Sequence, residues 1–194
     1  MACAIDRWVV ANTLAWIGDH ARRCGGNPGH YSINLTADSL TDEDFLGFVH
    51  ERIKRERVPP QSLCFEITET NAIANLSRAL EFMRSLKAIG CAFALDDFGS
   101  GVSSFGYLKN LPVDYVKVDG SFVRDICVDS TARVMVASIN NIAQEMGLKT
   151  VAEFVENQAI VDELRQLGVD YAQGFHLGKP RPLSEQVEVR MMPR

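Results

Sequence analysis

Apolar residues recur with helical spacing in three segments of the chain, and each of these segments ends at a glycine. The segments cover residues 75–90, 131–147 and 157–168, and they end at Gly90, Gly147 and Gly168. A glycine suits the left-handed residue that often follows the last turn of a helix. The pattern therefore predicts three amphipathic helices that each pack one face against a core.

Short apolar runs alternate with these helical patterns. Six runs read as strands, at residues 30–36, 62–68, 91–97, 114–119, 148–154 and 169–174. Further helices are expected at about residues 5–23, 41–57 and 103–110. Alternation of strands with helices predicts a parallel α/β fold. A closed (β/α)8 barrel has eight strands, so we expect either an open sheet or a barrel that lacks about two strands.

Polar side chains gather near the carboxyl end of each predicted strand. In chain order they are Asn34, Glu66 and Glu69, Asp96 and Asp97, Lys117 and Asp119, Glu153 and Glu156, and Gln173. The carboxyl ends of parallel strands meet on one side of the sheet, where α/β proteins bind their ligands. Any one of these residues has an ordinary structural explanation. It is improbable, however, that all six consecutive strands would carry a polar residue near the same end by accident.

The adjacent Asp96 and Asp97 are the most unusual of these residues, because an apolar run stops at two carboxylates and a glycine-rich turn follows. They could cap a helix or bind a cation. Glu66 lies between two apolar residues, where a lone carboxylate is costly to bury. Clustered carboxylates repel one another unless cations neutralise them. An all-oxygen set favours Mg²⁺ or Mn²⁺, and two such ions could polarise a water beside Lys117.

Composition narrows the choice of partner. The chain has 194 residues, 46% of them apolar and 23% charged, with a net charge of −5. It offers no basic surface for DNA or anionic lipid, so a phosphate compound would need a bound metal to attract it. Five scattered cysteines show no zinc-binding spacing and are expected to be reduced thiols. Neither a membrane span nor a signal peptide is evident, which predicts a cytoplasmic chain without membrane contact.

Six motifs in order resemble those of one bacterial family. They are SINLT, CFEITET, ALDDFGSG, VDYVKVDGSFV, TVAEFVE and VDYAQGFHLGKP. They are similar to the successive motifs of the EAL domain family, and the likeness runs from about Ile5 to Leu183. The resemblance implies a TIM-like (β/α)8 barrel that hydrolyses cyclic di-GMP to pGpG with Mg²⁺ or Mn²⁺ at a two-metal site.

The same resemblance assigns roles to individual residues. Metal ligands would be Asn34, Glu66, Asp96, Asp97 and Glu153; catalytic residues Lys117, Glu153 and Gln173; loop anchors Glu69 and Glu156; and substrate-binding residues Asp119 and Gln173. In the family, the loop corresponding to residues 98–104 couples the site to dimerisation. A homodimer is therefore expected, as is an upstream sensory or GGDEF domain in a longer parent protein.

Three departures from the family pattern stand out. Phe154 occupies a position where glycine is commonest, and Val102 one where an aromatic residue is frequent. No E-A-L or E-V-L tripeptide occurs, so the family's first strand is expected to lie outside this sequence. This predicts an EAL domain without its first strand and helix at residues 1–183, a tail at 184–194, and weak or no activity for the chain alone.

Two other interpretations stay open. The chain could be a non-catalytic module that binds cyclic di-GMP or a protein partner, although it keeps every ligand position that it covers. It could also be a different metal-dependent barrel enzyme, such as an enolase-like one. Asn34, the Asp96–Asp97 pair and Gln173 argue against that reading.

Overall fold

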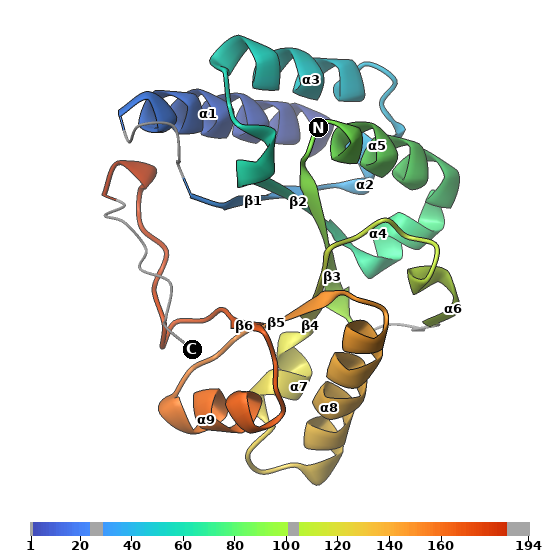
Figure 1. The fold of residues 1–194 in the computed structure, drawn as a ribbon, viewed down its shortest axis with the longest axis vertical. Coiled ribbons are helices and arrows are strands. Elements are labelled where there is room, and N and C mark those ends of the chain that lie inside the picture. Colours follow the sequence, from blue (N-terminus) through green and yellow to red (C-terminus); the bar gives the residue numbers. More distant parts are fainter. Residues whose placement is uncertain (1, 24–28, 101–104, 186–194) are drawn as a thin grey trace.

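A computed structural model describes residues 2–23, 29–100 and 105–185. Six parallel strands form one sheet in the order β1-β2-β3-β4-β5-β6, so strands that follow each other in the chain also pair with each other. Figure 1 shows the sheet curling through the middle of the molecule with helices along its outer side. This is an incomplete TIM-like barrel, as the sequence predicted.

All six predicted strands form. They are β1 (Tyr31–Leu35), β2 (Leu63–Thr68), β3 (Ala92–Phe98), β4 (Tyr115–Val118), β5 (Lys149–Ala152) and β6 (Tyr171–Ala172). β3 runs through both Asp96 and Asp97 and ends at Phe98, so the paired aspartates lie within the strand and cap no helix.

The predicted helices also form, with different bounds. The longer ones are α1 (Ala2–Arg23), α3 (Phe45–Glu56), α5 (Leu76–Ala88), α8 (Ser130–Glu145) and α9 (Gln158–Gln166). The shorter ones are α2 (Ala37–Thr41), α4 (Glu69–Ala74), α6 (Phe105–Leu108) and α7 (Gly120–Arg124), with 3-10 turns η1 (Pro60–Ser62) and η2 (Leu183–Glu185). Gly90, Gly147 and Gly168 have φ of +106°, +74° and +74°, which confirms their place after helix ends.

Three short helices, α2, α4 and α7, were missing from the sequence prediction, and one predicted helix begins later than expected. α4 and α7 begin at the strand ends themselves, where Thr68 and Asp119 cap them by accepting backbone N–H bonds. They are too short for an apolar period to show. The helix expected at 41–57 begins only at Phe45, because the backbone at Asp42 is extended and the Asp42 side chain accepts the N–H of Asp44. The separate helix α2 lies before it.

The core lies between the sheet and its outer helices. Phe65 on β2 and Phe93 on β3 both pack edge-on against Phe82 of α5, and all three side chains are buried. The helices α1 and α3 pack closely, since a methyl group on Gly18 would lie 2.2 Å from the backbone oxygen of Glu56. This rigid outer layer holds the strand ends in place.

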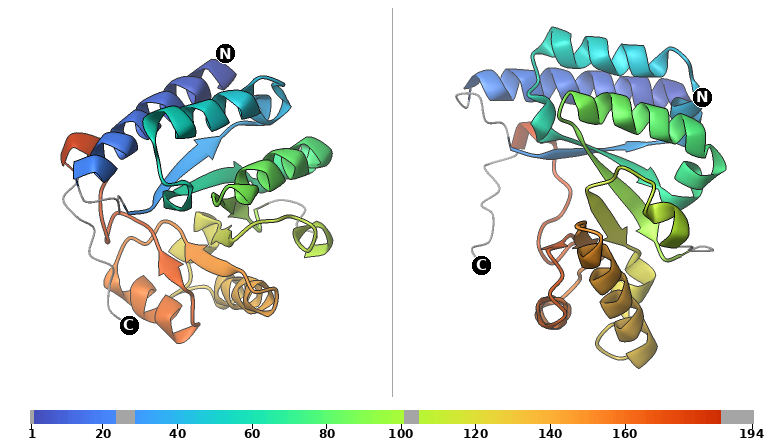
Figure 2. Two further views of the ribbon diagram at one scale, coloured as in Figure 1. Left: turned by 45° about the horizontal axis from the view of Figure 1, so that its top comes forward. Right: turned by 45° about the vertical axis from the view of Figure 1, so that its right-hand side comes forward.

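The sheet's two edges are β1 and β6 in the part of the chain that the structure describes. The segment after β6 runs back toward the C-terminal end of α1, as both figures show (Figures 1 and 2). No helix within the described residues is long and apolar enough to cross a bilayer.

Candidate active site

A buried ammonium group lies at the centre of the strand ends. Lys117 on β4 donates to Glu66 on β2 at 2.6 Å, and its Nζ lies 2.9 Å from Asp96 and 2.8 Å from Glu153. The Lys117 side chain is only 5% exposed. Three carboxylates, two within β2 and β3 and one directly after β5, therefore share one cation, as the convergence of strand ends predicted.

Register explains why these side chains face one another. Asn34 on β1 is the direct neighbour of Glu66 on β2. Side chains alternate across a strand, so residues at matching positions of neighbouring strands point to the same face. That face is the inner side of the curled sheet, and it also carries Lys117.

A β-bulge aims the paired aspartates. Leu95 pairs with Val116 and Phe98 pairs with Val118, which leaves Asp96 and Asp97 together opposite Lys117. Asp97 takes up the extra residue with a left-handed backbone, at φ 52°. A bulge re-aims side chains at a sheet end. Here it directs Asp96 toward Lys117 and leaves Asp97 exposed beside it.

A second bulge does the same one strand further on. The backbone N–H of Gln173 donates to the backbone oxygen of Ala152. The backbone oxygen of Gln173 accepts from the backbone N–H of Val155. Glu153 and Phe154 thus oppose the single residue Gln173. Phe154 is also left-handed, at φ 53°. Glu153 is directed at Lys117, while the ring of Phe154 is turned outward and is 48% exposed.

The residues fit a divalent cation. Asp96, Asp97 and Glu153 each offer a carboxylate oxygen, and these oxygens lie within 4.8 Å of one another. Glu66 joins them through Lys117, and Asn34 is exposed at the matching position of β1. Hard oxygen donors of this kind suit Mg²⁺ or Mn²⁺. Three of the five ligands that the family resemblance assigned thus lie close enough to share an ion, and metal binding by the full set stays a prediction.

Burial and mutual repulsion shift the ionisation of the site. Burial raises the pKa of Glu153, and repulsion from Asp96 and Asp97 adds to this against the pull of Lys117. The pKa of Asp97 is also raised, by partial desolvation of its carboxyl group and by repulsion from Asp96 and Asp119. Burial works against the charged form of Lys117, but Glu66 and the other carboxylates hold its pKa above the ordinary value. Lys117 is thus an ammonium at neutral pH.

Glu69 connects the site to the segment after β3. Its buried carboxylate accepts the backbone N–H of Gly99 at 3.2 Å and the hydroxyl of Tyr107 on α6. These are contacts that a loop anchor requires, and Tyr107 is a partner that the sequence did not reveal. Most of the loop itself, residues 101–104 with Val102, lies outside the described residues.

The remaining predicted residues sit around the site with other contacts. Asp119 accepts the N–H of Ser121 and caps α7. Gln173 is exposed at the end of β6 and lines the cavity on the inner face of the sheet, which has a volume of about 300 Å³. Glu156 is exposed beyond β5. Their assigned roles stay predictions.

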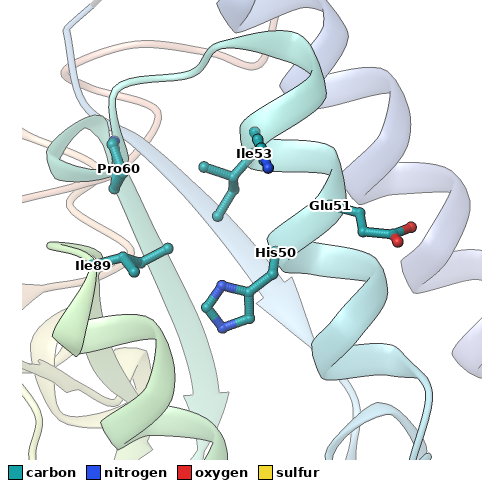
Figure 3. Close-up of a pocket in the computed structure, with 6 residues that line it drawn as sticks. His50, Glu51, Ile53, Pro60 and Ile89 are labelled. Atoms are coloured by element: carbon teal, nitrogen blue, oxygen red, sulfur yellow. The ribbon is translucent and has the colours of Figure 1, made fainter.

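Another pocket, of about 390 Å³, lies on the outer side between α3 and the turns that precede β2 and β3. Figure 3 shows the His50 ring and Ile89 near it, with Glu51 directed away. His50 bonds the hydroxyl of Ser85 at 2.9 Å. Pro60 and Ile89 come before their strands begin, so this pocket is at the opposite end from the carboxylates. Among the described residues, Glu51 is the one carboxylate that lines it, so the pocket has no carboxylate cluster.

Curated proteins are similar to this chain in sequence. Cyclic di-GMP phosphodiesterase PdeB of Shewanella oneidensis is 44% identical over 98% of this chain. Cyclic di-GMP phosphodiesterase PdeF of Escherichia coli is 37% identical over 94% of it. The chain spans only 22% and 24% of the length of these two relatives.

Solved structures share its fold. The EAL domain of DcpA from Mycobacterium smegmatis has a TM-score of 0.89 at 33% identity, over 95% of this chain and 83% of that domain. The PaMucR phosphodiesterase in its cyclic di-GMP complex has a TM-score of 0.86 at 31% identity, over 94% of this chain and 73% of that one. The EAL domain family model matches residues 1–180, and the chain belongs to the EAL domain family.

Proposed function

We propose that this EAL domain hydrolyses cyclic di-GMP to the linear dinucleotide pGpG in a reaction that depends on Mg²⁺ or Mn²⁺. The observation that carries the proposal is the buried Lys117 ammonium, held by carboxylates from β2, β3 and β5. The names of the relatives point to the same substrate, since two are cyclic di-GMP phosphodiesterases and a structural neighbour is a complex with cyclic di-GMP.

Metal ions would be held by Asp96, Asp97 and Glu153, with Glu66 and Asn34 completing the donor set. When bound, such ions supply Lewis acidity toward a phosphoryl oxygen and lower the pKa of a bound water. They also offset the acidity of the site, which would otherwise repel a phosphodiester from a chain of net charge −5.

The chain's own groups divide the remaining work. Lys117 keeps its proton, so it acts as a fixed positive charge that orients three carboxylates and stabilises negative charge developing on the phosphate. The pKa of Glu153 is raised, which makes its carboxylate a stronger proton acceptor than an ordinary glutamate. Water gives a proton to Glu153 as its oxygen bonds to phosphorus. The bond from phosphorus to a ribose 3′-oxygen then breaks, and that oxygen leaves as a hydroxyl by taking back the proton that Glu153 accepted from the water.

Turnover by the 194-residue chain tests this proposal. Cyclic di-GMP is incubated with protein and Mn²⁺, and the nucleotides are separated by chromatography. We expect pGpG in the presence of Mn²⁺ and none with EDTA. Lys117→Met should reduce turnover at least 100-fold, since one preorganised charge in a buried site is worth about 10²–10³ in rate.

Lys149→Met is the matched control, because Lys149 pairs with Asp170 at 2.6 Å but is 52% exposed and lies at the other end of β5. It should keep wild-type turnover. Turnover that persists in Lys117→Met, or pGpG formed equally in EDTA, would contradict the proposal.

The proposal has four further parts. Gln173 and Asp119 would contact the nucleotide from the rim of the site, and Glu69 would hold the loop at residues 98–104 for a homodimer contact. The domain would occupy residues 1–183, followed by a tail at 184–194, and would act in the cytoplasm, where a cyclic nucleotide messenger would be met.

A further inference from the structure

Phe154 adopts a backbone conformation that costs free energy for any residue with a side chain. Its φ of 53° lies in the left-handed region, which glycine enters freely and other L-residues avoid. The residue is the second of the pair at the β5 bulge, immediately after Glu153. If its backbone returned to an ordinary extended conformation, the bulge would be lost and Glu153 would swing away from Lys117.

The ring of Phe154 is fitted into a specific place on α7. A methyl group built on Gly120 would lie 2.0 Å from Cδ2 and 2.6 Å from Cγ of Phe154, so the ring lies directly against the bare backbone of Gly120. The guanidinium of Arg124, one helical turn further on, covers the ring at 4.4 Å from its centre. The ring is therefore held between the start and the end of one short helix.

We propose that Phe154 is a positioning residue. Its ring, clamped between Gly120 and Arg124, holds the left-handed backbone that keeps the carboxylate of Glu153 on Lys117. This inference rests on the proposed function for its catalytic consequence, but its structural part can be tested without turnover. The contact also ties α7, which Asp119 caps, to the loop that carries Glu153.

The proposal predicts that the smaller substitution at position 154 is the less damaging one. In Phe154→Ala, the left-handed conformation keeps its cost but loses the ring that holds it, so Glu153 should leave Lys117. In Phe154→Gly, the ring is also lost, but the left-handed conformation is then free of strain, so Glu153 should stay. A role in packing alone predicts the opposite, because glycine fills less space than alanine and gives the unfolded chain more freedom.

Crystal structures and thermal unfolding of the metal-free variants read out this order directly. We expect Glu153 to remain within hydrogen-bond distance of Lys117 in Phe154→Gly and to leave it in Phe154→Ala, which should also unfold at the lower temperature. With Mn²⁺ and cyclic di-GMP, kcat should fall about 10-fold in Phe154→Ala and KM less than 3-fold. Phe154→Gly and Phe154→Tyr should recover most of kcat.

Gly120→Ala supplies a second, independent test. The added methyl group must displace the ring. Gly120→Ala should therefore lower the unfolding temperature and kcat, as Phe154→Ala does. In the Phe154→Gly background there is no ring to displace, and the same Gly120→Ala change should have no effect. Phe175→Ala, which removes another exposed aromatic ring, serves as the control and should resemble wild type.

Two results would overturn the proposal. One is Glu153 staying on Lys117 in Phe154→Ala, and the other is Phe154→Gly being as impaired as Phe154→Ala. If Phe154→Ala fails to fold, the cycle between Gly120→Ala and Phe154→Gly decides the question. If the wild type shows no turnover, the proposed function fails, while the crystal structures still decide the role of Phe154.

Discussion

The buried charge of Lys117 allows a stability prediction with a worked magnitude. Lys117→Met keeps most of the side chain's length and removes the ammonium, which leaves three carboxylates at former distances of 2.6–2.9 Å without their shared cation. Removing one partner from a buried ion pair costs about 3–5 kcal/mol, because the remaining charge is left uncompensated. At 5% exposure of the lysine, solvent provides little screening.

The assay is urea unfolding of wild type and variant in EDTA at neutral pH. We expect the free energy of unfolding to fall by about 3–5 kcal/mol, which corresponds to a midpoint roughly 10 °C lower on heating a chain of this size. Lys149→Met, at a lysine that is 52% exposed, should cost at most about 1 kcal/mol.

Divalent metal should then repair much of the damage. Without repulsion from the Lys117 ammonium, the same carboxylates should bind Mn²⁺ more tightly than in wild type, and a ligand at about 100 times its dissociation constant adds about 2.7 kcal/mol of stability. The gap between Lys117→Met and wild type should therefore narrow when Mn²⁺ replaces EDTA. A cost in EDTA under about 1 kcal/mol, or no recovery with Mn²⁺, would refute the view of Lys117 as the cation that neutralises this cluster.

Three other predictions concern stability. The pKa of Glu153 is raised above 4.5 by burial, so its contribution to metal-free stability is present below that pH and is lost as pH rises through the folded pKa. The stability of wild type minus that of Glu153→Gln, from urea unfolding in EDTA, should thus fall as pH rises from 4.5; a flat or rising difference would contradict this. Asp6 is 5% exposed and accepts three hydrogen bonds from the segment after β1, so Asp6→Ala should cost about 2–4 kcal/mol; Asp19→Ala, exposed on the same helix, is the control and should cost under about 1 kcal/mol. Gly18→Ala should lower the free energy of unfolding by about 1–3 kcal/mol, because the methyl group forces α1 and α3 apart. Gly47→Ala, with open space around it, should raise it by up to about 1 kcal/mol. Equal effects at the two glycines would refute the close helix contact.

The sequence was enough for the order of elements and for the gathering of polar side chains at one end of the sheet. Gly90, Gly147 and Gly168 ended their helices as expected, because helix ends depend on local chemistry. Glu66, Asp96, Lys117 and Glu153 meet because parallel strands present their carboxyl ends together. Both predictions rest on rules that need no knowledge of tertiary packing.

The bulges could not be predicted in the same way. A period of two describes a regular strand, and nothing in the pattern shows that two residues on β3 oppose one on β4. The left-handed conformation of Asp97 follows from that bulge, and that of Phe154 follows from the bulge between β5 and β6. Neither residue type predicts such a conformation. Phe154 stood out in the sequence only as a departure from glycine, and its contact with Gly120 became visible only once β5 and α7 were placed together.

The central claim is that the strand-end carboxylates bind metal and cyclic di-GMP together. Its most direct test is calorimetric titration of the 194-residue chain with cyclic di-GMP in the presence of Ca²⁺, which in this family permits binding but suppresses hydrolysis. We predict micromolar binding that is lost in Asp96→Ala and in EDTA, and retained in Asp162→Asn at an exposed position of α9. A folded sample that binds no cyclic di-GMP, or binds it equally well in Asp96→Ala, would contradict the account.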